Sequence, residues 1–510
     1  MGRRGGVSQR AIGGGDTPSV TNLIKAATPT TELLGKRQPP FQRLEMSKSA
    51  ALQQGHDNVP LGLAAFDSLH AEDEPWLQRC YVPPADFELM ARWRSILVFG
   101  DPGVGKTALR LALQRRWAAP EGGRRSLVVY WPFSLEEDPN LTGTRLMRAY
   151  SAQALDVAAR ALARHLAGSP PDWMQMPDWA QYTLAWFLRQ FLRGRAEQYV
   201  ESLAPEFSGA QIAALREVLA RPAPDVLPSS SPIPLIIAEI VKATQALGLE
   251  GIRLTVDALE PWYETDRMLV ADHLESFLNA LALFEHPRFT YAIMVPGELD
   301  CRDWSPGSVA RRRVDAYRLQ WDIDMLVRIM ERRLALALGE DEFPLSKLGP
   351  PDRLRQWLAG CGGRNPRGWL ATLRPFVNRF AVKSAKTGQQ QPLTDEECVR
   401  VQAESPPRLH VEPSTGRIFV GWREVTGLQP AQIALLKYLY AQRGEPCPRQ
   451  TVLRVYLEAT KQLFRLDDPK SERLLDQPIY RLRQAIEPDP YHPVFIFTER
   501  GGTIRLQNAW

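Results

Sequence analysis

The chain alternates between short apolar runs and longer segments with a helical pattern. Short segments rich in apolar residues, which predict strands, lie at 95–99, 127–131, 252–256, 289–295 and 317–321. Helical patterns cover residues 107–117 and most of 140–248, with breaks at Pro170-Pro171 and at 222–234. Because strands alternate with helices, we expect a parallel sheet covered by helices on both faces.

The segments on either side of this region have a different character. The first ~55 residues are rich in Gly, Ser, Thr and Pro without sustained periodicity, which is typical of a mobile tail. Residues 322–385 have a helical pattern, and a polar stretch at 383–392 links them to a compact C-terminal unit. The expected domains are a tail (1–58), an α/β core (59–321) with a helical insertion (about 140–248), a helical lid with linker (322–392) and a C-terminal unit (393–510).

Composition agrees with a multidomain globular protein. The 510 residues are too many for one hydrophobic core, and 44% of them are hydrophobic and 24% charged. No run of about 18 uncharged apolar residues occurs, and the N-terminus lacks the apolar stretch of a secretory signal, so we expect no membrane contact. The cysteines stand far from one another, which favours reduced thiols in a cytoplasmic protein over zinc sites or disulfides; they are Cys80, Cys301, Cys361, Cys398 and Cys447.

The net charge of +5 is concentrated at the two ends of the chain. Residues 1–50 contain eight Lys/Arg against three Asp/Glu, and residues 401–510 contain fifteen against twelve. Basic ends permit contact with nucleic acid without requiring it.

A glycine-rich motif follows the first predicted strand and precedes a helix. The segment from Gly100 to Thr107 satisfies GxxxxGK[ST], in which backbone N–H groups and the helix N-terminus hold phosphate oxygens. Lys106 is expected to reach the β- and γ-phosphates, and the Thr107 hydroxyl to bind Mg²⁺. This Walker A loop predicts binding of ATP, or of another NTP, by Gly100, Asp101, Pro102, Gly103, Val104, Gly105, Lys106, Thr107 and Ala108.

Asp257 ends the strand 252–256 and gives it the form of a Walker B motif, whose carboxylate orients Mg²⁺ beside Thr107. One strand, at 126–131, lies in sequence between the Walker A strand and this one. Over roughly residues 60–385 the chain resembles the additional-strand P-loop ATPases, which include the AAA+ and STAND groups. The resemblance implies an α/β P-loop NTPase fold with a helical insertion and a helical lid.

The catalytic residues are less regular. Ala258 stands where AAA+ proteins usually carry a glutamate, whereas the acidic group of the STAND pattern comes three or four residues after the aspartate. Glu260 is therefore the candidate base, with a structural role as its alternative, and any hydrolysis is expected to be slow. The end of the strand at Val295-Pro296 shows no clear sensor 1 residue.

Two arginine-containing segments are candidate nucleotide sensors. Gly363-Arg-Asn-Pro-Arg367 resembles the sensor 2 region of replication-initiator ATPases, which implies that Arg367 contacts the γ-phosphate and couples it to the lid. The alternative is a surface arginine at a helix start. Arg311-Arg-Arg313 is either a finger for a neighbouring subunit's nucleotide or, more simply, a solvated basic turn.

The C-terminal unit has its own order of elements. Short strands at 408–412 and 417–420 precede helices at 428–439, 449–456 and 476–486, and a hairpin pairs 494–498 with 503–506. With its aspartate-led helix containing Ile-Tyr-Arg-Leu-Arg and its closing Thr-x-Arg-Gly turn, the unit resembles the winged-helix domain of OmpR/PhoB-type regulators. No receiver domain accompanies it.

The helix 476–486 is the candidate recognition helix. Its apolar side chains share one face at about 100° per residue and are expected in the core: Leu475, Ile479, Leu482 and Ile486. Pro478 fits the first turn if Asp476 is the N-cap. The outward face carries residue types that suit base edges and phosphates, and the predicted DNA-binding residues are Arg473, Gln477, Tyr480, Arg481, Gln484 and, at the hairpin tip, Arg500. A solvated face on a protein-interaction module is the alternative.

These expectations combine into an ATP-dependent switch that binds double-stranded DNA through its winged helix. Its predicted role is that of a bacterial transcriptional regulator that assembles into a homo-oligomer on binding ATP, since joined subunits bind DNA by avidity. Two alternatives remain open. One is a DNA-loading or DNA-remodelling ATPase related to initiators or transposition proteins, and the other is a STAND-type defence sensor whose winged helix contacts protein.

Overall fold

The computed structural model describes residues 66, 70–119, 125–133, 143–169, 173, 175–192, 196–221, 231–257, 259, 266–301, 313–412, 416–461, 474–499 and 502–509. The chain divides into the units Met1–Asp57 and Asn58–Trp510, and every described residue belongs to the second. Within these described ranges, no helix is both long and apolar enough to span a bilayer.

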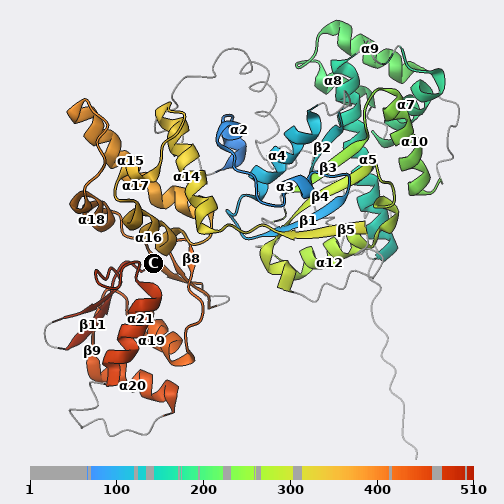
Figure 1. Ribbon diagram of the computed structural model, residues 1–510. Coiled ribbons are helices and arrows are strands. Elements are labelled where there is room, and N and C mark those ends of the chain that lie inside the picture. Colours follow the sequence, from blue (N-terminus) through green and yellow to red (C-terminus); the bar gives the residue numbers. More distant parts are fainter. Residues whose placement is uncertain are drawn as a thin grey trace, which may run out of the picture. The chain divides into compact units, whose positions relative to one another are not determined.

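Five parallel strands form the central sheet (Figure 1). They are β1 (Ser95–Gly100), β2 (Leu127–Pro132), β3 (Ile252–Asp257), β4 (Phe289–Pro296) and β5 (Val314–Arg318). The spatial order is β2-β3-β4-β1-β5, with every pairing parallel. Because β4 separates the Walker A strand β1 from the Walker B strand β3, the additional-strand α/β fold expected from the sequence is confirmed.

The predicted position of the last strand was wrong. The expected strand at 317–321 is β5, which starts three residues earlier and ends at Arg318. β5 is an edge strand whose side chains are all at least partly exposed, so it carries no apolar run. The apolar residues that suggested a strand, Leu319 and Trp321, are buried in the core that continues into the lid.

Alternate residues of each strand point into two different cores. On β1, Ile96 and Val98 pack with α4 (Lys106–Ala118) and the lid, whereas Leu97 and Phe99 face the insertion helices and α12 (Arg267–Asn279). The insertion consists of α5 (Gly143–Gly168), α7 (Asp178–Phe191), α8 (Ala196–Leu203), α9 (Gly209–Ala220) and α10 (Ile233–Ala246).

Helices follow β5 and form the lid. They are α14 (Ile323–Leu338), α15 (Leu345–Leu348), α16 (Pro351–Gly362), α17 (Pro366–Thr387) and α18 (Asp395–Glu404). α18 buries Cys398 and Val401 in the same core as the lid helices. The four cysteines whose burial is described, Cys80, Cys361, Cys398 and Cys447, are buried free thiols.

The C-terminal domain has a separate core, which begins at Leu409. Its strands are β6 (Leu409–Val411), β7 (Ile418–Val420), β8 (Arg423–Glu424), β9 (Pro446–Pro448), β10 (Ile496–Thr498) and β11 (Thr503–Leu506). Its helices are α19 (Pro430–Ala441), α20 (Arg449–Thr460) and α21 (Asp476–Ile486). The hairpin β10–β11 is extended by β9 to three strands, which completes a winged helix.

The geometry predicted for α21 is confirmed on its apolar side. The four expected core residues are at most 5% exposed: Leu475, Ile479, Leu482 and Ile486. The expected cap was wrong, because Leu475 is the N-cap and makes no side-chain cap bond. Asp476 instead pairs with Arg449, and Pro478 lies in the first turn, where its missing N–H breaks no helical bond.

Candidate nucleotide site and DNA-binding face

The Walker A loop runs from the end of β1 into α4, which begins at Lys106. Two of its residues have positive φ, Gly103 at 81° and Gly105 at 103°, a conformation that favours glycine. The turn directs the first N–H groups of α4, which have no partner inside a helix, toward the space where phosphate oxygens bind. The loop therefore has the backbone geometry that the motif predicted.

Lys106 is only 5% exposed and lies against its own loop. Its Nζ donates to the carbonyl oxygens of Gly100 and Asp101, the latter at 3.2 Å. Trp321 also stabilises the loop, because its Nε1 donates a hydrogen bond to the carbonyl oxygen of Val104 at 2.7 Å.

Thr107 and Asp257 lie together, as predicted for the metal site. The Thr107 hydroxyl donates to Oδ2 of Asp257 at 3.3 Å, although the two residues are 150 positions apart in sequence. A hydroxyl and a carboxylate are the oxygen ligands that Mg²⁺ prefers, and this ion usually completes its shell with phosphate and water. The described residues contain no group of three His, Cys, Asp or Glu that could hold a metal by themselves, so the pair fits an ion shared with a nucleotide.

A cavity of about 430 Å³ connects this loop to the lid. Its lining includes Walker A residues together with Asp257 and Arg367. The segment 70–82, here called the strap, and residues of α14 and α17 also line it. The volume and the mixed polar and apolar lining suit a nucleotide whose phosphates meet the loop.

A buried ion pair joins the strap to the lid in the lining of this cavity. Arg333 of α14 donates two hydrogen bonds to the carboxylate of Glu74, at 2.8 and 3.1 Å, and stacks on Trp76 with 4.5 Å between guanidinium carbon and ring centroid. Burial raises the pKa of Glu74, and the charge of Arg333 opposes that rise. The pair fixes one wall of the cavity.

The elbow between α16 and α17 lies directly on the Walker A loop. Asn365 is the N-cap of α17, where its Oδ1 accepts from the backbone N–H groups of Arg367 and Gly368. Its Nδ2 donates to the carbonyl oxygen of Pro102 at 2.9 Å. A Cβ on Gly103 would lie 2.9 Å from Oδ1 of Asn365, so the close approach of lid and loop requires glycine there.

Other candidate residues of this site are only partly described. Glu260, Arg311 and Ala258 lie outside the described residues. Arg313 pairs with Glu285 of the same chain at 3.1 Å. After β4, where no sensor 1 residue was expected, Glu298 pairs with Arg267 and with Arg417 of the winged helix.

The predicted DNA-binding face of α21 is exposed to solvent. Four of the predicted residues lie on it and are exposed, with Tyr480 at 60%: Gln477, Tyr480, Arg481 and Gln484. Arg473 and Arg500 lie outside the described residues. Arg483 has an internal function, since its Nε donates to the carbonyl oxygen of Ile496 at 3.1 Å and holds the wing against the helix.

One arginine connects the lid to this helix. Arg423 of β8 donates from Nε to the carbonyl oxygen of Gly360 at 2.7 Å, and from Nη2 to those of Ala485 and Ile486 at 3.1 and 3.4 Å. It therefore binds the C-terminal ends of α16 and α21 together, where a cation is favoured by the helix dipoles. Beside it, the backbone N–H of Trp422 donates to the carbonyl oxygen of Cys361 at 2.7 Å.

Several residues of the site were not recognised from the sequence. Asn365 had a usable signal, because Asn before Pro is a typical helix start. Trp321 and Arg110 had none, since Trp321 lies 217 positions from Val104 and Arg110 lies 147 positions from Asp257. Glu72 and Glu74 belong to a strap that no motif marks.

Comparisons with known proteins found several solved structures at low similarity and one family model that matches the C-terminal part of the chain. No curated protein matches the chain. Solved structures similar to it are the Aeropyrum pernix ORC2 protein in ADPNP-ADP complexes (11% identity, 89% of this chain and 93% of that one, TM-score 0.31) and the Aeropyrum pernix ORC1 protein in complex with DNA (14%, 88% and 90%, 0.29). A third is Cdc6p from Pyrobaculum aerophilum, with 12% identity and a TM-score of 0.30 over 88% of this chain and 95% of that one. Residues 423–506 match the family model described as "Transcriptional regulatory protein, C terminal", which confirms the winged-helix resemblance drawn from the sequence.

Proposed function

We propose that this chain is an ATP-controlled switch that binds double-stranded DNA through α21 and regulates transcription. The observation that carries the proposal is the bridge made by Arg423, which joins the lid to the helix that bears the DNA-binding face. The lid also contacts the Walker A loop through Asn365, so nucleotide and DNA sites are connected by consecutive contacts.

In this proposal the nucleotide's phosphates meet Lys106, the N-terminus of α4 and Arg367. Mg²⁺ bound at Thr107 and Asp257 would neutralise phosphate charge. Arg367 lies on the first turn of α17, so its attraction to the γ-phosphate acts on the elbow that also touches Trp422 and Arg423. Binding of nucleotide can then change the position of the lid, with Glu260 as the candidate base that ends the signal slowly.

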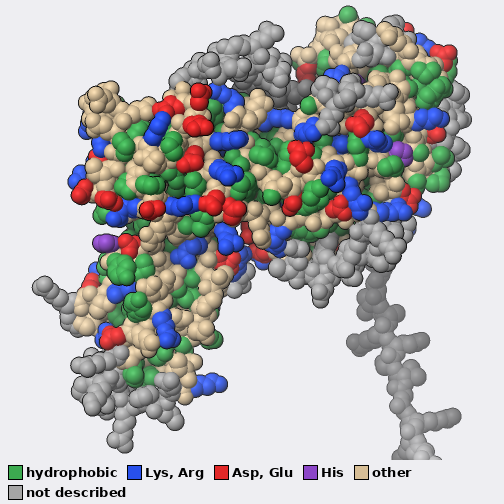
Figure 2. Space-filling view, viewed as in Figure 1, with side chains coloured by type: hydrophobic (Ala, Val, Ile, Leu, Met, Phe, Trp, Pro, Cys, Tyr) green, Lys and Arg blue, Asp and Glu red, His purple; other side chains and the backbone are tan. Residues whose placement is uncertain are grey.

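Charge distribution supports binding by several subunits. On the face shown in Figure 2, basic and acidic side chains are interspersed and form no large patch of one sign. A single winged helix of this kind has a weak electrostatic attraction for DNA. Assembly of a homo-oligomer on ATP would place several α21 helices on one DNA molecule and raise affinity by avidity.

The test is DNA binding by the full chain, with a matched pair of variants. We expect Arg481→Ala to weaken binding by ~1–3 kcal/mol if Arg481 reads a base, or to lower the salt slope by about one if it contacts phosphate. Arg400→Ala removes the same charge from exposed α18 and should leave affinity unchanged. Sequencing the DNA recovered with the protein, with and without ATP, then identifies any preferred site.

The same measurements separate the alternatives. ATPase activity strongly stimulated by DNA of any sequence would favour a loading or remodelling ATPase over a regulator. Equal binding by Arg481→Ala, Arg500→Ala and the unmodified chain, with no site enriched, would remove the DNA-binding role and favour a defence sensor whose winged helix contacts protein.

A further inference from the structure

Arg110 is an arginine in an interior position beside the metal site. It lies in α4, four residues after Lys106, and its side chain is 2% exposed. Arginine is almost never fully buried unless its charge is compensated, because removing it from water is costly. Its partners therefore indicate what it does.

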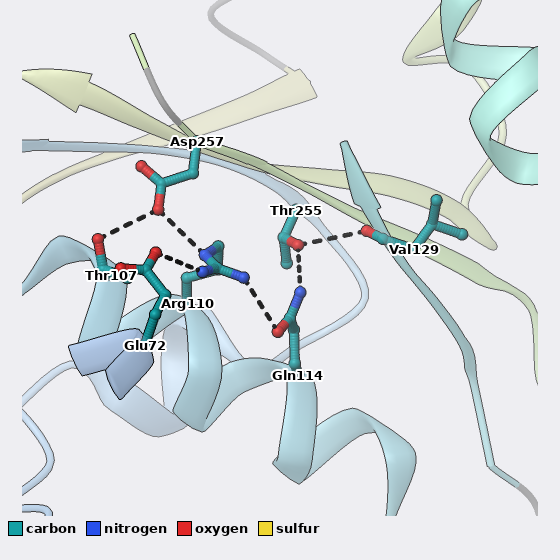
Figure 3. A network of polar contacts seen from close by, with 7 residues as sticks. All are labelled: Glu72, Thr107, Arg110, Gln114, Val129, Thr255 and Asp257. Atoms are coloured by element: carbon teal, nitrogen blue, oxygen red, sulfur yellow. Dashed lines mark hydrogen bonds and ion pairs between the residues drawn. The ribbon is translucent and has the colours of Figure 1, made fainter. Parts of the chain in front are cut away.

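The guanidinium binds two carboxylates from different parts of the chain (Figure 3). Its Nε donates to Oδ2 of Asp257 at 3.0 Å, and its Nη2 donates to Oε1 of Glu72 at 3.0 Å. Nη1 is 3.4 Å from the side-chain oxygen of Gln114, and the ring centroid of Tyr130 is 4.2 Å from the guanidinium carbon. Every nitrogen thus has a partner, which fixes the group in one orientation.

The contact with Asp257 concerns the atom that faces the metal site. Oδ2 accepts both from Arg110 and, at 3.3 Å, from the hydroxyl of Thr107. A guanidinium is charged at every accessible pH. The negative charge of Asp257, which in P-loop sites is compensated by Mg²⁺, is therefore already compensated here by a side chain.

The contact with Glu72 concerns the strap. Glu72 lies in η5 (Ala71–Asp73) and lines the cavity together with Lys106, Thr107 and Asp257. Without Arg110, two carboxylates would face the space that receives the phosphates, and their repulsion would act on phosphate and strap alike.

We propose that Arg110 is a positioning residue that weakens the dependence of nucleotide binding on Mg²⁺, because it shares its positive charge between Asp257 and Glu72 and holds the strap in place. The inference rests on the proposed nucleotide binding and deepens it. It assigns to a side chain the charge compensation that the ion usually supplies, and leaves the ion's effect on the phosphates themselves unchanged.

The test is equilibrium titration of the full chain with a fluorescent ATP analogue, in excess Mg²⁺ and in excess EDTA. For the unmodified chain we expect the two dissociation constants to differ by less than about threefold. In Arg110→Met, the ratio of the dissociation constant in EDTA to that in Mg²⁺ should rise on the order of tenfold, because binding in EDTA becomes weaker. A change of this size is roughly what one uncompensated charge interaction contributes.

Matched variants exclude a merely structural effect. Arg115→Met makes the same substitution at an exposed position of α4 and should keep the low ratio. Arg110→Lys keeps the charge and should keep the dependence on Mg²⁺ weak. Adding Glu72→Gln to Arg110→Met removes one of the two carboxylates and should restore part of the binding in EDTA.

Four outcomes would overturn the inference. One is a ratio in Arg110→Met equal to that of the unmodified chain. Another is a tenfold or larger loss of affinity in EDTA by the unmodified chain itself. If Arg110→Met does not fold, Glu72→Gln alone decides. Its amide oxygen can still accept from Arg110 and hold the strap, whereas the loss of one negative charge should tighten binding in EDTA. An unchanged affinity contradicts the proposed charge compensation. An unmodified chain that binds no nucleotide in either condition overturns the proposed function as well.

Discussion

The Lys106 side chain is hydrogen-bonded to its own loop, so a bound phosphate would have to replace these hydrogen bonds. Its Nζ hydrogen-bonds to the carbonyl oxygens of Gly100 and Asp101, which are neutral acceptors. A triphosphate offers stronger, charged acceptors at the same end of the cavity. Under the proposed function, such an exchange would keep the buried cation hydrogen-bonded in both states.

Lys106→Ala should abolish ATP binding, because it removes the point charge directed at the β- and γ-phosphates. Equilibrium titration with a fluorescent ATP analogue measures this, and Arg115→Ala, an exposed position of the same helix, is the control. An affinity equal to that of the unmodified chain would show that the loop does not bind phosphate in the proposed way.

Glu260→Gln should preserve ATP binding and lower the rate of hydrolysis, since an amide cannot accept a proton from water. The motivation is its place three residues after Asp257, with Ala258 in the usual catalytic position. Single-turnover hydrolysis measures the chemical step directly. Hydrolysis at the unmodified rate would assign the base to another segment or to a neighbouring subunit.

At the scale of elements, the elbow between α16 and α17 has two separable functions. Asn365 caps α17 through its Oδ1 and holds the Walker A loop through its Nδ2. The first function is local to the helix, whereas the second joins residues 263 positions apart. Substitutions of different length distinguish them.

Asn365→Ala should lower the stability of the chain by about 1 kcal/mol through loss of the cap, and should weaken ATP binding. Asn365→Ser keeps a capping oxygen but is too short to reach Pro102, so it should weaken ATP binding without the loss of stability. Thermal unfolding and ATP titration of the two variants provide both measurements. Equal ATP affinities in the Ser variant and the unmodified chain would show that the contact with Pro102 has no part in binding.

Elements with a strong local pattern were predictable, and contacts between distant segments were not. The recognition helix was placed at 476–486, the same residues as α21, because a period near 3.6 separates its buried and exposed faces. The edge strand β5 was misplaced because an exposed edge carries no such pattern. Arg110 and the strap could not be found, since a buried ion pair depends on tertiary contacts that no local sequence pattern encodes.

At the scale of the whole molecule, the lid is the common partner of both binding sites. Asn365 on the first turn of α17 touches the Walker A loop, and Gly368 in the same turn packs against Trp422, where an added Cβ would lie 2.5 Å from the tryptophan Cβ. Arg423 continues the path to α21. A second connection runs from β4 through Glu298 to Arg417. Only the first path passes through the lid, so a change in the lid acts on α21 through Arg423.

Arg423→Met should therefore uncouple the sites. We expect it to bind ATP as the unmodified chain does and to bind DNA at the level seen without ATP, because the exposed face of α21 remains. Addition of ATP should no longer tighten DNA binding. Arg443→Met is the matched control and should respond to ATP normally, because it removes a guanidinium that contacts the carbonyl oxygen and ring of nearby Tyr440.

Particle mass and DNA affinity, measured together with and without ATP, complete the test. In the unmodified chain ATP should increase both the particle mass and the DNA affinity. The gain in DNA affinity should exceed the contribution of any single side-chain contact, because ATP changes the number of winged helices that bind one DNA molecule. Both responses should vanish in Lys106→Ala. An assembly that grows with ATP while DNA affinity stays flat contradicts the regulator and favours the defence sensor. A normal DNA response in Arg423→Met would show that oligomer formation alone, without the bridge from α16 to α21, transmits the nucleotide state to DNA.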